Sequence, residues 1–234
     1  MCSLARRSKL GGELGSSRFH AHSVTVVPTT IDTDKYRVRP PKANDGPLVI
    51  GWTGSYSTVQ HLDTLRGALK KLAETEKFRL RVIGTPSYEC APVETEAMPW
   101  RAATELEDLG AIDIGVMPLP DDNWSKGKCG LKALQFMALG IPTVCSPVGV
   151  NTDIIQDNEN GFLAMSEEEW VEKLTSLLRS AELRRRLGDA GRATVEEKYS
   201  AVTQAPRVYE IFRSVGLSYK ALPSHKEAQN AQMS

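Results

Sequence analysis

The 234-residue sequence has no long apolar run, no surplus of charge of one sign and only four cysteines. No run approaches the roughly 18 to 20 apolar residues that a membrane-spanning helix needs. The 29 basic residues equal the 29 acidic ones, which argues against a general nucleic-acid-binding protein because such proteins usually carry a basic excess. No two cysteines have the C-x-x-C spacing of a metal site, so we expect free thiols and a reducing compartment. These absences predict a cytoplasmic protein, with peripheral association at the inner face of a membrane as an alternative.

Apolar runs alternate with helical patterns along most of the chain. Strands are predicted at 24–27, 48–52, 78–83, 112–119, 143–145 and 162–163. Helices are predicted at 62–72, 102–109, 131–139, 170–178, 181–197 and 202–214. A Ser-x-x-Glu capping box at Ser166 begins the fourth helix, and 84–100 is predicted to be a loop. Strands that alternate with helices favour parallel pairing, so the predicted fold class is α/β, a Rossmann-like doubly wound parallel sheet flanked by helices.

The loops after the strands are where we expect the binding residues. Ligands of open parallel sheets bind outside the carboxyl ends of the strands, at the point where the strand order reverses. The loops in question follow Trp52, Ile83, Leu119 and Cys145.

Residues 126–142, KGKCGLKALQFMALGIP, are the most informative segment. Its glycines precede a helix, whose free N–H groups and positive dipole end suit a phosphate. Lys128, Lys132 and Gln135 recur at spacings of four and three, which predicts one shared face. Lysines supply charge to a phosphate, and an amide can bond to a vicinal diol. The pattern indicates a diphosphate-plus-ribose site, although a solvated helix face with ordinary lysines explains it equally well.

The same segment resembles the donor-site helix of GT-B glycosyltransferases of family 4, the group 1 enzymes. That family usually has two glutamates eight positions apart around a Gly-Leu, followed by G-x-P. Here Gly130-Leu131 and Gly140-Ile141-Pro142 match, Gly127 stands at the first glutamate and Gln135 at the second. The segment is similar to a variant branch in which the lysine contacts the donor phosphates and the glutamine holds the ribose.

The resemblance continues in order over about residues 24–200. The other matching stretches are 26–32, 51–55, 113–119, 146–151 and 160–163. One departure concerns the first loop, where the family often has a basic pair, because residues 51–60 contain no lysine or arginine. Lys128 and Lys132 would then provide more of the charge that holds the diphosphate.

The resemblance and the helix pattern together assign a set of binding residues. The donor phosphate contacts are Lys128, Lys132, Gly130, Leu131, Gly54 and Ser55. Gln135 is assigned to the ribose. Candidate sugar or base contacts are Asp121, Asp122, Gly84 and Trp100. A solvated turn explains the aspartates equally well. No catalytic residue is assigned.

Two further motifs are weighed against simpler readings. Asp32-Thr33-Asp34 spells the D-x-D of a metal site, but it lies in a linker, so no metal is predicted. His61 is expected to be an exposed position at the start of a helix in preference to a catalytic residue.

The resemblance implies a glycosyltransferase that needs no cofactor. It would move a sugar from a nucleoside diphosphate sugar to a hydroxyl of a saccharide or lipid-linked acceptor, in polysaccharide or glycoconjugate synthesis. The expected segments are a poorly ordered or remnant stretch at 1–23, an interdomain-like segment at 24–47, a GT-B C-terminal donor domain at 48–216 and a polar tail at 217–234. The N-terminal GT-B domain would be absent from this chain or separate from it.

Two alternatives remain open at this point. A non-catalytic module that only binds the sugar nucleotide would need the same residues. A GT-B-fold sugar-nucleotide epimerase would need acids from the other domain. A dehydrogenase is disfavoured because G-x-x-G, and not G-x-G-x-x-G, follows the strand at 48–52.

Overall fold

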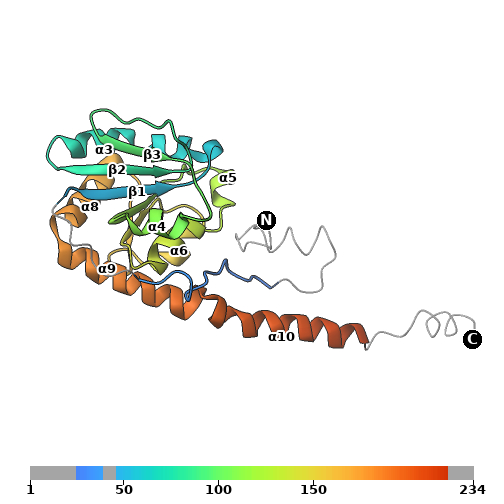
Figure 1. The fold of residues 1–234 in the computed structure, drawn as a ribbon. Coiled ribbons are helices and arrows are strands. Elements are labelled where there is room, and N and C mark those ends of the chain that lie inside the picture. The colour runs from blue at the N-terminus through green and yellow to red at the C-terminus, as the bar shows by residue number, and fades with distance from the viewer. Residues whose placement is uncertain (1–24, 39–45, 221–234) are drawn as a thin grey trace, which may run out of the picture.

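The structure is a computed structural model that describes residues 25–38 and 46–220. It contains a six-stranded sheet with the order β3-β2-β1-β4-β5-β6, in which every neighbouring pair is parallel (Figure 1). This confirms the predicted fold class. The order reverses between β1 and β4, so the ligand-binding position of such folds lies at the carboxyl ends of these two strands. The predictions for residues 1–23, for Val24 and for most of the tail fall outside the described residues.

The strands are β1 (Leu48–Thr53), β2 (Phe78–Ile83), β3 (Glu94–Met98), β4 (Ile114–Met117), β5 (Thr143–Cys145) and β6 (Phe162–Leu163). The first helices are η1 (Tyr56–Thr58), α2 (Gln60–Asp63), α3 (Arg66–Ala73), α4 (Glu105–Gly110), α5 (Asn123–Lys126) and α6 (Leu131–Ala138). The later helices are α7 (Asn151–Ile154), α8 (Glu167–Arg179), α9 (Ala181–Thr194), η2 (Val195–Tyr199) and α10 (Ala201–Lys220).

Two hydrophobic cores cover the two faces of the sheet. Neighbouring side chains of a strand point to opposite faces, and Val49 and Ile50 accordingly belong to different cores. The leucines of α2 and α3 pack with α8 on one face, whereas α4 and α6 cover the other (Figure 1). Burial on both faces explains why the central strands read as continuous apolar runs.

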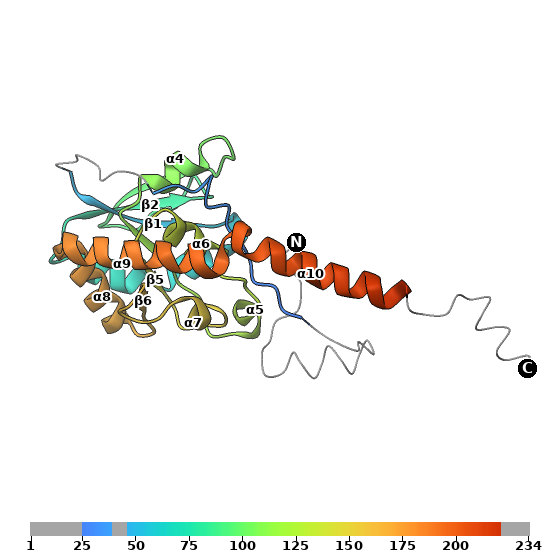
Figure 2. The same cartoon turned by 90° about the horizontal axis from the view of Figure 1, so that it is seen from below.

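The segment 25–38 is attached to the domain near the start of α10. Ile31 forms an isolated parallel bridge with Ser200 and is buried. The Arg192 guanidinium on α9 donates to the backbone oxygens of Thr33 and Tyr36. From there α10 extends away from the sheet, as Figure 2 shows.

Several predicted elements differ from the observed ones. The predicted loop 84–100 contains β3, an edge strand whose polar side chains hide the apolar signal of a strand. The predicted helix 62–72 is interrupted between α2 and α3. The described part of 24–27 forms no strand, and α10 continues past the predicted boundary at Gly216.

Candidate functional site

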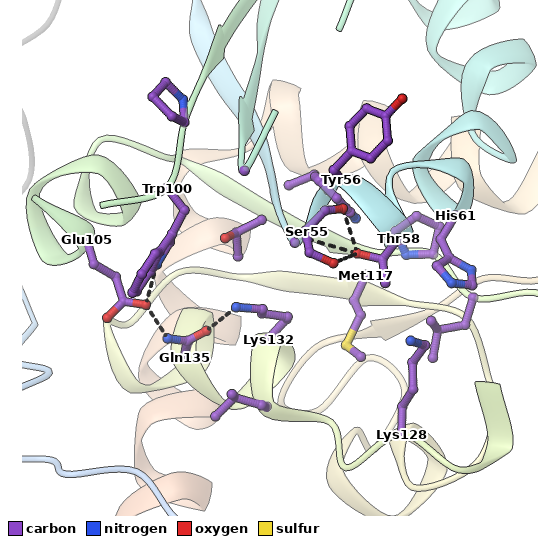
Figure 3. A pocket seen from close by; sticks show the side chains of 18 residues that line it. Ser55, Tyr56, Thr58, His61, Trp100, Glu105, Met117, Lys128, Lys132 and Gln135 are labelled. Atoms are coloured by element: carbon purple, nitrogen blue, oxygen red, sulfur yellow. Dashed lines mark hydrogen bonds between the residues drawn. The ribbon is translucent and has the colours of Figure 1, made fainter. Parts of the chain in front are cut away.

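A cavity of about 690 Å³ opens at the carboxyl ends of β1, β2 and β4 (Figure 3). Eight of its lining residues were predicted as phosphate, ribose, sugar or base contacts. Six of them are Gly54, Ser55, Gly84, Trp100, Lys128 and Lys132. Leu131 and Gln135 from α6 complete the predicted residues that line it. The fold therefore brings together loops that lie far apart in the sequence, from Gly54 to Gln135.

The glycines of the first two loops allow these loops to touch. Gly84 has a φ of 122°, a conformation that side chains rarely adopt. A Cβ atom at Gly84 would lie 2.0 Å from the Gly54 carbonyl oxygen. The Gly54 amide in turn donates to the Ile83 carbonyl over 3.0 Å. This wall of the cavity is therefore made of closely packed backbone.

The lysines reach the cavity from two different elements. Lys132 belongs to the first turn of α6, but Lys128 lies in the turn before it, so the two do not share one helix face as predicted. Gly130 caps the helix with a φ of 72°. Gly130 does not line the cavity, and a Cβ there would lie 2.3 Å from Ile154 Cδ1. Its position explains how the chain turns sharply enough to bring Lys128 beside the cavity.

Gln135 lies in a network of polar side chains that the sequence alone did not reveal. Its Nε2 donates to the Tyr36 hydroxyl over 2.8 Å and to Glu105 Oε1 over 3.1 Å. Its Oε1 accepts from Lys132 Nζ over 3.2 Å. The Tyr36 hydroxyl donates to Glu105 Oε2, and Trp100 Nε1 donates to Glu105 Oε1. The amide of Gln135 thus positions an acid and a lysine at the same time.

The network sets the charge of its members. Burial acts to raise the pKa of Glu105, but the hydrogen bonds it accepts from Trp100 and Tyr36 hold that pKa below its ordinary value. Burial lowers the pKa of Lys132, an effect opposed by the charge of Glu105. Burial raises the pKa of Tyr36 to about 12. At neutral pH the cavity therefore contains an ionised carboxylate beside a partly buried ammonium group.

His61 is buried, although the sequence favoured an exposed helix-start position. Its exposed fraction is 5%, and it lines the cavity. Its Nδ1 has no hydrogen-bond partner. Burial lowers the pKa of His61, Lys128 lowers it further, and Asp122 acts in the opposite direction. The imidazole is consequently held neutral at one end of the cavity.

The remaining candidates lie outside the cavity. Asp121 forms an ion pair with Lys126 over 2.7 Å, and Asp122 caps α5 by accepting from the Ser125 amide over 2.6 Å. Asp32 accepts from the amides of Asp34 and Lys35, which makes its D-x-D motif a turn.

Within residues 25–38 and 46–220 no group of three His, Cys, Asp or Glu side chains is arranged to hold a metal ion. Over the same residues no helix combines the length and apolar character needed to cross a membrane.

Sequence reasoning missed Glu105 and Tyr36, and it expected His61 at the surface. Tyr36 and Glu105 lie 69 positions apart, and Tyr36 and Gln135 lie 99 apart, so no local pattern joins them. One usable signal was the glutamine in place of an acid at 135, which points to a carboxylate from elsewhere.

The family model described as glycosyl transferases group 1 matches residues 47–180. The chain belongs to the group 1 glycosyltransferases. Spore coat protein SA of Bacillus subtilis (strain 168) is 29% identical over 81 residues, which cover 33% of this chain and 22% of that protein.

Solved structures show the same GT-B fold. Sucrose-phosphate synthase from Thermosynechococcus elongatus superposes with a TM-score of 0.68 and 16% identity, over 88% of this chain and 56% of that one. HepE from Anabaena, solved in complex with UDP and glucose, gives a TM-score of 0.66 and 14% identity, over 79% of this chain and 55% of that one. The chain therefore spans about half the length of these glycosyltransferases.

Proposed function

We propose that the cavity binds a nucleoside diphosphate sugar and that the protein takes part in transfer of the sugar to an acceptor hydroxyl. The observation that carries this proposal is the combination of Lys128, Lys132 and the start of α6 with the glycine loops at the reversal of strand order. A helix start with nearby ammonium groups is a favourable site for a phosphate. The HepE complex, which contains UDP in a protein of the same fold, supports this choice of ligand.

The donor would lie along the cavity with its base at Trp100. The Trp100 side chain is 47% exposed, lines the cavity and has its N–H bound to Glu105, so one face of the indole remains available for stacking. The diphosphate would lie between Lys132 and Lys128, opposite Ser55. In the reaction, the two lysines and the helix dipole would stabilise the charge that develops on the leaving diphosphate.

We propose that the acceptor site lies mainly outside the described residues. GT-B chemistry takes place between two domains, and a second α/β domain, in the same protein or in a partner chain, would contribute the saccharide or lipid-linked acceptor site. We place the reaction in polysaccharide or glycoconjugate synthesis, in the cytoplasm or at the inner face of the membrane. No described residue is assigned as a catalytic group.

Calorimetric titration tests the donor site. The full chain is titrated with UDP-glucose and GDP-mannose, and then with uridine and guanosine as matched ligands without phosphates. Binding of one sugar nucleotide, with much weaker binding of its nucleoside, is the expected result because the lysines act on the phosphates. Equal affinity for nucleotide and nucleoside, or no binding of either sugar nucleotide, would contradict the proposal.

A further inference from the structure

The carboxylate of Glu105 is held inside the cavity by donors from three separate elements. Trp100 Nε1 follows β3 and lies 3.0 Å from Oε1. Gln135 Nε2 belongs to α6 and lies 3.1 Å from the same oxygen. The Tyr36 hydroxyl comes from the segment 25–38 and lies 2.9 Å from Oε2. Such a network fixes both the position and the ionised state of the acid.

The order of the groups along the cavity matches the order of groups in a nucleotide. Figure 3 shows Trp100 and Glu105 on one side, Gln135 and Lys132 in the middle, and Lys128 and His61 on the other side. An aromatic ring and an acid thus lie together at one end, followed by an amide and two cations. A nucleoside diphosphate presents a base, a ribose diol and a diphosphate in the same sequence.

We propose that Glu105 is a specificity-determining residue that accepts a hydrogen bond from the ribose diol of the nucleotide, with Tyr36 and Gln135 as positioning residues. This inference rests on the proposed function of the same cavity. A carboxylate is an acceptor with about four lone-pair sites, and three are occupied by the bonds described above, so one remains to accept from a ribose hydroxyl. The Gln135 amide nitrogen is already committed to Tyr36 and Glu105, so the glutamine acts on the ribose mainly through the acid.

The charge of the network explains why residue 135 is a glutamine in this chain. A glutamate there would place a second carboxylate oxygen about 3 Å from Glu105 Oε1, and two like charges at that distance disfavour joint ionisation. The amide instead donates to the acid and accepts from Lys132. The acid for the ribose thus comes from the first turn of α4, and α6 supplies the group that orients it.

Discrimination between ribo- and deoxyribonucleotides tests the inference. The full chain is titrated with UDP and 2′-deoxy-UDP, and with GDP and 2′-deoxy-GDP. The wild type should prefer the ribonucleotide by at least about tenfold, the ratio expected when one hydrogen bond to a charged acceptor is lost. Glu105→Gln should bring the ratio close to one mainly by weakening ribonucleotide binding, and Tyr36→Phe should lower it part-way.

Two further variants make the result specific. Glu107→Gln removes an exposed acid from the same helix outside the cavity and should leave the ratio unchanged. Glu105→Asp keeps the charge but draws it back by one methylene, and it should also lower the ratio, which provides a second variant should Glu105→Gln fold poorly. An unchanged ratio in a folded Glu105 variant that still binds UDP or GDP overturns this inference alone. Failure of the wild type to bind any of the four nucleotides overturns the proposed function as well.

Discussion

Lys132 is the cation that the structure ties most closely to the rest of the cavity. Its ammonium group donates to Gln135, and burial lowers its pKa while the charge of Glu105 opposes that effect. Burial has already removed part of the water around this ammonium group, so a phosphate that binds beside it would have little further water to displace. Under the proposed function, Lys132 would therefore contribute more to phosphate binding than a fully solvated lysine.

We expect Lys132→Ala to weaken UDP or GDP binding by about 1.5–3 kcal/mol, the range for a hydrogen bond to a charged group. Lys126→Ala is the matched control, because Lys126 pairs with Asp121 and does not line the cavity. Calorimetric titration measures the affinity of both variants for UDP and GDP. An equal loss in the two variants, or none in either, would remove the phosphate role of Lys132.

His61 should make the folding free energy depend on pH. Burial and Lys128 hold its folded pKa below the ordinary value of 6.5, so protonation favours the unfolded chain. The contribution of His61 to stability is present above pH 6.5 and decreases as pH falls through that value towards the lowered pKa. Between pH 7.5 and 5.5 the wild type should lose more stability than His61→Leu, by the linkage argument above. Urea unfolding at several pH values gives the comparison, and parallel curves for the two proteins would contradict it.

At the level of elements, the capping box of α8 was predicted from four residues and is present. Ser166 Oγ accepts from the Glu169 amide over 3.2 Å, and Glu169 Oε2 accepts from the Ser166 amide over 3.1 Å. The backbone amides of Met165 and Ser166 also lower the pKa of Glu169. The cap lies outside the cavity, so its loss should affect stability without affecting nucleotide binding.

Ser166→Ala should reduce the free energy of unfolding by about 1 kcal/mol, the usual cost of losing an N-cap side chain. Ser176→Ala is the control from the interior of the same helix, where alanine is a good helix former and the change should be close to neutral. Chemical denaturation distinguishes them. If both variants were equally stable, the capping box would be dispensable.

Helices and strands could be predicted from the sequence where neighbouring residues determine them, and were missed where distant contacts do. β1, β2, β5, β6 and α6 were predicted nearly to their ends because buried apolar runs and glycine or proline boundaries act within a few residues. β3 was missed because its stability comes from pairing with β2 and from contacts such as the ion pair of Arg81 and Glu96. The network around Glu105 was missed for the same reason, since its members meet only after the sheet has formed.

At the scale of the whole molecule, the described residues provide a cavity at the carboxyl ends of the strands and the helix α10, which extends from the domain. Val202, Tyr209 and Phe212 of α10 are exposed, and they represent apolar surface that the sheet does not cover. The chain spans about half the length of the glycosyltransferases that it superposes on. Transfer requires the donor and the acceptor to be held in register, and the described residues are assigned only to the donor in the proposal above.

We therefore expect the 234-residue polypeptide to bind a nucleotide without transferring sugar on its own. The assay combines the purified polypeptide with labelled UDP-glucose or GDP-mannose and with saccharide or lipid acceptors. Robust transfer by the monomer would show that a catalytic group lies within this chain.

A crystal structure of the chain with bound UDP-glucose or GDP-mannose tests the central claim most directly. The account predicts the diphosphate between Lys132 and Lys128, opposite the loop of Gly54 and Ser55, with the ribose at Glu105. A nucleotide ordered elsewhere on the molecule, or bound in this cavity with its phosphates turned away from both lysines, would contradict it.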